Sequence, residues 1–277
     1  MRNIVSQQEA VTTVFELDID RVSRLLKAKG CPADSRLFWF DRIGSTNDHI
    51  MGLRDYHGTV CVAGEQTAGR GRRGRVWESA PGAGLYLSMG WDMKGTNPVG
   101  LSLLCGLTLL ESLQESGVAG LALKWPNDVL LDGDKLAGVL VELNGSRCII
   151  GIGLNVTLPY CSGDSSIASR ENALPRTSLA AHGYTLDAES FTATLIHLLY
   201  RDLSMFCRTG FAAFVERWNA AHAYQGKTVQ ITGAAVAAGE VVGVDDRGGL
   251  CLQVNGEKQI FHVGDVSMKP DALSSMP

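Results

Sequence analysis

A short run of arginines and glycines is the part of this sequence that is best suited to binding an anion. Residues 69–75 read Gly-Arg-Gly-Arg-Arg-Gly-Arg. Glycine lets the backbone approach a ligand closely, and the forked donors of arginine match the oxygens of carboxylate and phosphate groups. The segment therefore predicts a loop that holds an anionic ligand, and a solvated basic loop is the alternative.

The glycine spacing in this segment also fits the fingerprint of dinucleotide-binding folds. That fingerprint is meaningful only where the loop opens a helix. Here Trp77, Pro81, Gly82 and Gly84 follow instead, and this pattern does not begin a helix. We therefore reject a dinucleotide-binding fold. The alternating glycines also make a merely solvated loop the weaker interpretation.

Residues 124–128, which read Lys-Trp-Pro-Asn-Asp, form a second segment with groups suited to phosphate chemistry. Lys124, and Lys135 further along the chain, can offset negative charge that develops in a reaction. Asn127 or Asp128 can hold magnesium near phosphates. A strand end followed by a turn, with Lys135 in a surface ion pair, explains this segment equally well by itself. Its presence together with the arginine-glycine segment favours a shared site.

The elements around these segments are mostly short strands. Apolar runs predict strands at residues 37–40, 59–65, 85–91, 121–125, 129–131, 136–143 and 148–156. Helical spacing and capping residues predict helices at residues 18–29, 45–53 and 97–117. Short turns between the last four strands imply antiparallel pairing. The predicted fold class is therefore α+β with a mainly antiparallel sheet.

The predicted secondary structure changes from helices to short strands after Gly226. Before it, a polar segment at residues 158–175 leads to helical stretches at 187–207 and 211–221. After it, short apolar runs at 227–232, 239–244, 250–254 and 258–263 predict a small β-barrel. We expect three regions: an N-terminal helical extension at 1–36, a catalytic domain at 37–225, and a C-terminal barrel domain with its tail at 226–277.

Composition disfavours several classes of function. Lysine and arginine total 25 against 29 acidic residues, a net charge of -4, whereas proteins that grip nucleic-acid backbones are usually basic. The longest apolar stretch, Leu101–Leu110, is too short to span a bilayer, and residues 1–9 lack the apolar core of a signal peptide. The cysteines are dispersed, without the pairs of a zinc or redox motif. We therefore expect a cytoplasmic protein that binds neither DNA nor a membrane.

Five segments, in this order along the chain, resemble the biotin protein ligase family. They are residues 45–47 (Ser-Thr-Asn), 65–75 (Glu-Gln-Thr-Ala before the arginine-glycine run), 124–128, 135–138 (Lys-Leu-Ala-Gly) and 151–155 (Gly-Ile-Gly-Leu-Asn). The resemblance implies a catalytic domain like that of class II aminoacyl-tRNA synthetases and a Src-homology-3-like C-terminal barrel. It also implies a two-step reaction, in which ATP and biotin form biotinyl-5'-AMP and biotin passes to a lysine of the biotin carboxyl carrier protein, an acetyl-CoA carboxylase subunit.

The resemblance assigns expected roles to the matched residues. Those expected to bind biotin are Ser45, Thr46, Asn47, Gln66, Arg70, Gly71, Arg72 and Lys135. Those expected to bind ATP are Arg72, Arg75, Trp77, Lys124, Asn127, Asp128, Asn155 and Lys269. Lys135 and Arg72 are the expected catalytic residues, and Asp128 is the expected ligand of Mg²⁺. Many family members have an arginine at the position of Lys269, so a weaker, single-point contact is expected there.

Other functions remain open alternatives. A lipoate or octanoate ligase of the same superfamily would share the adenylate chemistry but have a narrower, more apolar acid pocket, and the arginine-rich segment favours biotin. A non-enzymatic, biotin-responsive regulator that binds DNA would need an N-terminal helix-turn-helix, and the 36 residues before the first predicted strand are too few for it. Residues 45–47 can also serve only as a helix cap. A homodimer is compatible with the sequence.

Overall fold

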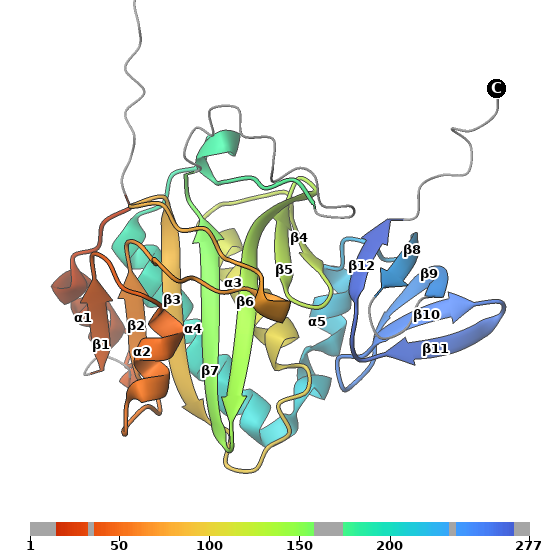
Figure 1. Ribbon diagram of the computed structural model, residues 1–277, viewed down its shortest axis with the longest axis horizontal. Coiled ribbons are helices and arrows are strands. Elements are labelled where there is room, and N and C mark those ends of the chain that lie inside the picture. The colour runs from red at the N-terminus through yellow and green to blue at the C-terminus, as the bar shows by residue number, and fades with distance from the viewer. Residues whose placement is uncertain (1–14, 33–35, 158–173, 233–236, 269–277) are drawn as a thin grey trace, which may run out of the picture.

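A seven-stranded sheet forms the larger part of the computed structural model, which describes residues 15–32, 36–157, 174–232 and 237–268 (Figure 1). The strand order is β1-β2-β3-β7-β6-β5-β4. The strands are β1 (Leu37–Phe40), β2 (Val60–Ala63), β3 (Gly84–Asp92), β4 (Leu121–Lys124), β5 (Asp128–Leu131), β6 (Asp134–Asn144) and β7 (Arg147–Asn155). Only β1 and β2 pair in parallel among these strands. The expected α+β class and the mainly antiparallel sheet are confirmed.

The parallel pair requires a crossover between its strands, and the short helix α2 (Thr46–Gly52) lies in that connection. Ser45 caps the helix, because its Oγ accepts a hydrogen bond from the Asp48 backbone N–H at 3.4 Å. The helix packs on β2, β3 and β7 and lies in front of the sheet in Figure 1. Its first turn therefore faces the middle of the sheet.

Longer helices cover the opposite face. α3 (Leu101–Glu115) and α4 (Ala188–Thr209) lie behind the sheet in Figure 1, and α1 (Ile19–Ala28) packs on α4. α3 is buried nearly all round because it contacts both the sheet and α4. It begins at Leu101 rather than at Asn97-Pro98, because Gly100 adopts a left-handed conformation with φ 88° just before it. A Cβ on Gly100 would lie 2.7 Å from the Phe211 side chain.

The shorter elements complete this part of the fold. They are the 3-10 turns η2 (Arg72–Gly74), η3 (Ala180–His182) and η4 (Phe211–Phe214), and the helix α5 (Val215–Ala220). The helical stretch expected at residues 211–221 is thus a 3-10 turn that continues into an α-helix. Most of the polar segment expected at residues 158–175 lies outside the described residues.

A second, five-stranded sheet follows α5. Its order is β11-β10-β9-β8-β12, and every pairing is antiparallel. The strands are β8 (Thr228–Thr232), β9 (Ala237–Val244), β10 (Leu250–Val254), β11 (Glu257–Phe261) and β12 (Asp265–Met268). The four strands expected in this region are confirmed, and β12 is an additional one. β12 pairs with β8, and Asp265 at its start pairs with the arginines of the loop at residues 72–75.

The two sheets share one apolar core. Buried side chains of the smaller sheet, such as Val241 and Leu252, belong to the same cluster as those of β3 and β7. The indole N–H of Trp125 donates to the Gly248 carbonyl oxygen at 3.0 Å across the junction. The smaller sheet is therefore packed firmly against the larger one. Within the described residues, no helix is both long and apolar enough to cross a membrane.

Candidate functional site

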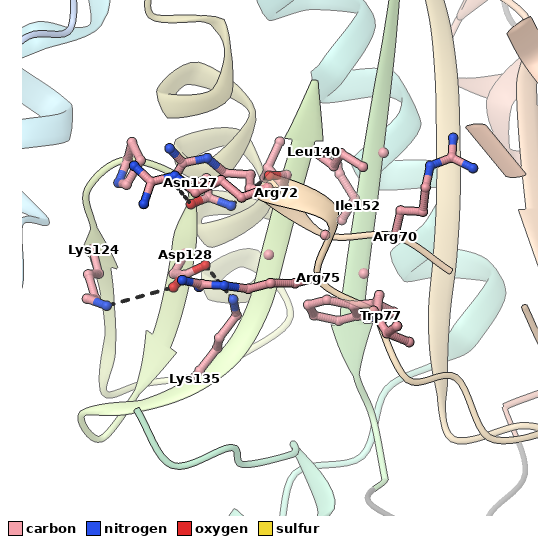
Figure 2. Close-up of a pocket in the computed structure, with 18 of the residues that line it drawn as sticks. Arg70, Arg72, Arg75, Trp77, Lys124, Asn127, Asp128, Lys135, Leu140 and Ile152 are labelled. Carbon is pink, nitrogen blue, oxygen red and sulfur yellow. Dashed lines mark hydrogen bonds and ion pairs between the residues drawn. The ribbon is translucent and has the colours of Figure 1, made fainter. Parts of the chain in front are cut away.

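A cavity of about 530 Å³ lies on the front face of the larger sheet and extends to β12 (Figure 2). It brings together every expected site residue that the structure describes. These are Ser45, Thr46, Asn47, Gln66, Arg70, Gly71, Arg72, Arg75, Trp77, Lys124, Asn127, Asp128, Lys135 and Asn155. Lys269 lies outside the described residues. Segments far apart in the sequence thus converge on one cavity, as the two-segment pattern predicts.

Glycines on β6 and β7 keep the floor of this cavity free of side chains. Gly138 and Gly153 are paired across the two strands, and the Trp77 ring lies against them. A Cβ on Gly153 would be 2.4 Å from that ring, and one on Gly138 would be 3.1 Å from it. A Cβ on Gly151 would be 2.5 Å from the Asn47 amide oxygen. These glycines therefore make room for an aromatic side chain and a polar one above the sheet.

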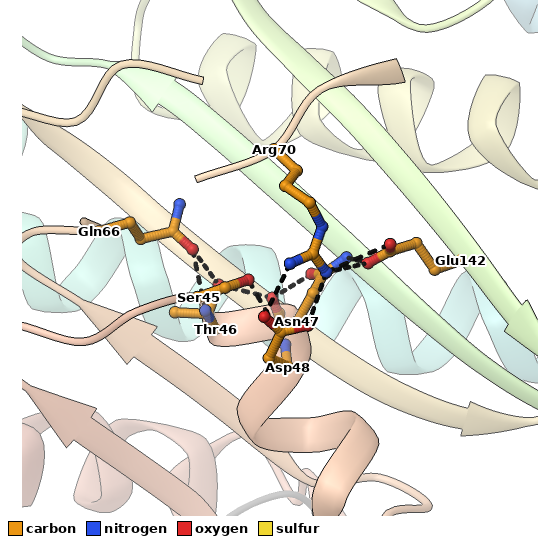
Figure 3. A network of polar contacts seen from close by, with 8 residues as sticks. Ser45, Thr46, Asn47, Asp48, Gln66, Arg70 and Glu142 are labelled. Carbon is orange, nitrogen blue, oxygen red and sulfur yellow. Dashed lines mark hydrogen bonds and ion pairs between the residues drawn. The ribbon is translucent and has the colours of Figure 1, made fainter. Parts of the chain in front are cut away.

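The first turn of α2 supplies a small, buried group of polar side chains (Figure 3). Gln66 Oε1 accepts from the backbone N–H and from the hydroxyl of Thr46, both at 2.9 Å. Ser88 Oγ from β3 lies within hydrogen-bond distance of Thr46 Oγ1, at 2.7 Å, and of Asn47 Oδ1. Hydroxyl and amide groups fixed in this way can recognise a compact ligand that carries N–H and C=O groups. Ser45 is at once the helix cap and a lining residue of the cavity.

Arg70 lies at the rim of the cavity beside this polar group. Its guanidinium binds the Asp48 carboxylate through both terminal nitrogens, at 2.7 Å each, and Nη2 also donates to Glu142 at 3.1 Å. The hydrogen bond from Arg70 lowers the pKa of Asp48 below its usual range. Figure 2 shows the Arg70 guanidinium turned away from the charged groups at the other end of the cavity. Neither Asp48 nor Glu142 is among the site residues expected from the sequence.

The remaining arginines of residues 69–75 gather around one carboxylate from the smaller sheet. Asp265 on β12 pairs with Arg73 at 2.8 Å, with Arg75 at 3.1 Å and with Arg72 at 3.4 Å. Arg72 also donates to the Asn127 amide oxygen at 3.0 Å. Burial lowers the pKa of Arg72, although an arginine stays protonated at neutral pH. A carboxylate that holds three cations marks a place where anionic phosphates can bind.

Two lysines flank Asp128 deeper in the cavity (Figure 2). Lys135 Nζ lies 2.6 Å from one Asp128 oxygen, and Lys124 Nζ lies 4.0 Å from the other. Lys135 Nζ is also 5.6 Å from the centre of the Trp77 ring. Burial lowers the pKa of Lys124. Lys135 thus lies beside both Asp128 and the Trp77 ring, within the charged end of the cavity (Figure 2).

The donor set limits how a metal can bind. Within the described ranges, no cluster of three or more histidine, cysteine, aspartate and glutamate side chains is present. Asp128 is the carboxylate nearest to the lysines, and Asn127 Oδ1 is bound to Arg72. One carboxylate fits Mg²⁺ only where phosphates and waters supply the other oxygens. A metal here would therefore arrive with a phosphate ligand.

The chain is similar in sequence to known proteins over both of its sheets. The sequence model of the biotin/lipoate A/B protein ligase family matches residues 39–156, and that of the biotin protein ligase C-terminal domain matches residues 225–269. The biotin–[acetyl-CoA-carboxylase] ligase of Paracoccus denitrificans is 34% identical over 240 residues, which cover 81% of this chain and 97% of the relative. The bifunctional ligase/repressor BirA of Salmonella typhimurium is 35% identical, over 82% of this chain and 72% of the relative.

A solved structure extends the likeness to the fold. The biotin protein ligase from Aquifex aeolicus in complex with biotin and ATP superposes with a TM-score of 0.74 at 29% identity. The match covers 84% of this chain and 97% of that one. The second family match spans the whole smaller sheet, and the first spans the larger sheet from residue 39 in β1 onward.

Proposed function

The chain belongs to the biotin protein ligase family, and from this membership we propose that the cavity binds biotin and ATP side by side and joins them as biotinyl-5'-AMP. The protein is an ATP-dependent ligase that activates biotin and transfers it to a lysine of a biotin carboxyl carrier protein. The observation that carries the proposal is the division of one cavity into a buried polar end on α2 and a strongly basic end formed by the loop of residues 69–75, β4 and β6.

The polar end is the proposed biotin site. Thr46, Asn47 and Gln66 offer fixed hydroxyl and amide groups to the ureido ring of biotin, and Ser45 adds a further hydroxyl at the helix cap. Leu87, Leu140 and Ile152 also line the cavity, and they suit the apolar part of the bicyclic ring and its aliphatic chain. The carboxylate of biotin would then extend beneath the loop formed by Arg70, Gly71 and Arg72, towards Lys135.

The basic end is the proposed ATP site. Arg72, Arg75 and Lys124 would bind the phosphates, and the triphosphate would replace Asp265 as the partner of the arginines. Trp77 offers an aromatic face, and its buried indole N–H has no hydrogen-bond partner within the part of the chain that the structure describes. Asn127, Asp128, Asn155 and Lys269 complete the proposed set, with Asp128 as the ligand of magnesium brought by ATP.

The proposed chemistry needs alignment and charge stabilisation. A carboxylate oxygen of biotin attacks the α-phosphorus, and the bond to the bridging oxygen breaks to release pyrophosphate. Lys135 and Arg72 would offset the charge that develops on the carboxylate and the phosphate during this step. In the second step, the neutral lysine amine of the carrier attacks the acyl carbon, and AMP leaves.

Several finer features of the proposal concern the whole protein. We propose the class II synthetase-like and Src-homology-3-like character of the two sheets, the region boundaries at residues 36 and 225, and a biotin carboxyl carrier domain of acetyl-CoA carboxylase as the partner. A homodimer is compatible with the proposal. The packed core between the two sheets supports a joint role of both in catalysis.

Pyrophosphate release tests the proposed function directly. The protein would be incubated with Mg-ATP and with biotin, lipoate or octanoate in turn, and biotin transfer to a carrier domain would be followed by mass spectrometry. We expect pyrophosphate with biotin only, and a mass increase of one biotin on the carrier. Release with lipoate or octanoate instead would favour the other ligases of the superfamily. Absence of release with all three acids would leave a binding protein without ligase activity.

A further inference from the structure

Residues 175–179 lie across the start of β6 and the end of β7, beside two residues of the proposed site. The Lys135 backbone N–H donates to the Pro175 carbonyl oxygen at 2.8 Å, and the Lys135 carbonyl oxygen accepts from the Thr177 N–H at 2.9 Å. The Asn155 side-chain amide donates to the Thr177 carbonyl oxygen at 3.0 Å. Thr177 is therefore bound to the expected catalytic lysine and to an asparagine of the proposed ATP site.

A histidine holds Thr177 from the other side. Thr177 Oγ1 lies 2.9 Å from His182 Nε2, and His182 Nδ1 lies 3.0 Å from Asp132 Oδ2. The carboxylate can only accept, so Nδ1 carries a proton, and in the neutral ring Nε2 then accepts from the Thr177 hydroxyl. Asp132 lies in the turn between β5 and β6, just before Lys135. The three side chains thus connect the turn that precedes Lys135 to the segment that lies beside it.

A carboxylate, an imidazole and a hydroxyl in this order can also activate a nucleophile. Thr177 is only 5% exposed, however, and neither Thr177 nor His182 is among the residues that line the cavity. A substrate bound in the cavity therefore does not reach this hydroxyl. The arrangement is better suited to holding the backbone in place than to attacking a substrate.

We propose that His182 is a positioning residue for adenylate formation, which fixes Thr177 and through it keeps Lys135 in place at the reacting end of the cavity. This inference rests on the proposed function and deepens it. The ammonium group of Lys135 stabilises developing charge only at a defined distance from the reacting atoms, so a displaced backbone reduces its effect. The contacts from residues 175–177 are made to the backbone of Lys135, and they leave its ammonium group available.

His182→Leu tests the inference, because leucine binds neither Thr177 nor Asp132. We expect the single-turnover rate of pyrophosphate release at saturating biotin and ATP to fall about ten-fold, since the buried hydroxyl of Thr177 loses its partner. The Michaelis constant for biotin should change less than about two-fold, because the proposed biotin site on α2 is held by Gln66 and Ser88 instead. A rate within about two-fold of that of the parent protein would overturn the inference.

A double-mutant cycle distinguishes action through Lys135 from a general loss of structure. If His182 acts through Lys135, His182→Leu should slow the Lys135→Ala protein less than about three-fold, because the group that it positions is already absent. A ten-fold effect of about the same size in both backgrounds would overturn the inference.

His57→Leu is the matched control. His57 Nδ1 accepts a hydrogen bond from the Asp92 backbone N–H at 3.1 Å, and His57 lies outside the cavity lining. The control should keep the parent rate, and equal slowing by both histidine variants would contradict the inference. Circular dichroism checks that each variant is folded. If His182→Leu does not fold, Thr177→Val takes its place, because it removes the same hydrogen bond from the other partner.

Amide hydrogen exchange supplies a test that does not depend on the reaction. Exchange is followed by mass spectrometry, with biotin and ATP added, in peptides that contain Lys135 and Thr177. We expect these amides to exchange about five-fold faster in His182→Leu than in the parent protein, and those of α3 to exchange at the parent rate. Unchanged exchange at Lys135 and Thr177 overturns the inference. Should biotin and ATP yield no pyrophosphate, the proposed function fails, while the exchange still tests whether His182 holds Lys135.

Discussion

At the scale of single residues, the charged groups of the cavity pair with one another when no ligand is bound. Asp265 holds the arginines, and Asp128 holds Lys135. An unpaired charge in a partly enclosed cavity costs free energy. These cations therefore pair with carboxylates of the protein until the phosphates of ATP replace them. Binding of ATP is therefore an exchange of partners, and the lysine and arginine nearest the reacting atoms have the largest effect on the rate.

Lys135→Ala should reduce biotinyl-adenylate formation by about 100-fold or more while the fold is retained, because a positioned donor is lost where charge develops. Single-turnover measurement of pyrophosphate release with saturating biotin and ATP checks this prediction. The exposed Lys27 on α1, changed to alanine, serves as the control for loss of a positive charge. A rate in Lys135→Ala close to that of the parent protein would refute the assigned role.

Arg72→Gly should release reactive adenylate into solution. Arg72 contacts both Asn127 and Asp265. Its loss breaks both contacts and removes a cation that retains the adenylate. The measurement is biotin incorporation into albumin added as a bystander. Arg73→Gly is the control from the same loop, since it removes the same charge next to the bridging position. Equal labelling of albumin by both variants would argue against specific retention by Arg72.

At the scale of elements, short apolar runs and turns in the sequence predict most strands of both sheets, because strands such as β2 and β3 are buried on both faces and therefore read as continuous apolar runs. They do not predict β12. That strand has four residues, and among Asp265, Val266 and Ser267 only Val266 is buried in the core, so its pairing depends on β8 rather than on its own pattern. Asp265 lies on β12 and was missed for this reason. Glu142 was missed because its partners come from distant segments.

Among the site residues, the arginine loop and the Lys-Trp-Pro-Asn-Asp turn were predictable, since residue type alone indicates anion chemistry there. The role of the strand glycines was not, because it depends on a ring that packs on them from another segment. Gly138 and Gly153 lie beneath Trp77 only once β6 pairs with β7 and residues 69–77 fold back over the sheet. Spacing along the chain contains no signal for that contact.

Gly153→Ala should therefore displace the Trp77 ring and raise the Michaelis constant for ATP about ten-fold, with a smaller effect on that for biotin. The new Cβ would lie 2.4 Å from the present position of the Trp77 ring, so the ring would have to move. Gly52→Ala, at the end of α2, is the control, because nothing lies within 4 Å of a Cβ there. Unchanged ATP kinetics in a folded Gly153→Ala protein would show that Trp77 does not face ATP.

At the scale of the whole molecule, the two sheets behave as one packed body. Residues 221–223 pair with the edge strand β4 before the chain enters the smaller sheet, through backbone hydrogen bonds of Leu123 with Ala221 and Ala223. Deleting the smaller sheet would expose Trp125 and remove the hydrogen bond from its indole N–H to Gly248. Changes at single residues of the junction are therefore better probes of its role than truncation.

His222 lies within this junction and should make the stability of the protein depend on pH. The side chain is 7% exposed and packs on the Trp218 ring. Burial lowers the pKa of His222 to about 4 from the ordinary value of 6.5. Between these values the unfolded chain binds a proton that the folded protein does not. The stability contributed by neutral His222 is thus present above pH 6.5 and lost as the pH falls towards 4.

His222→Phe should remove this dependence, because phenylalanine keeps an aromatic ring in the junction but cannot bind a proton. We expect the free energy of unfolding of the parent protein to fall by about 2 kcal/mol more than that of the variant between pH 7 and pH 4.5. Urea unfolding followed by circular dichroism at several pH values measures the difference. The exposed His262, changed to phenylalanine, should leave the parent's pH dependence in place. Parallel curves for the parent protein and His222→Phe would show that His222 does not resist protonation in the folded state.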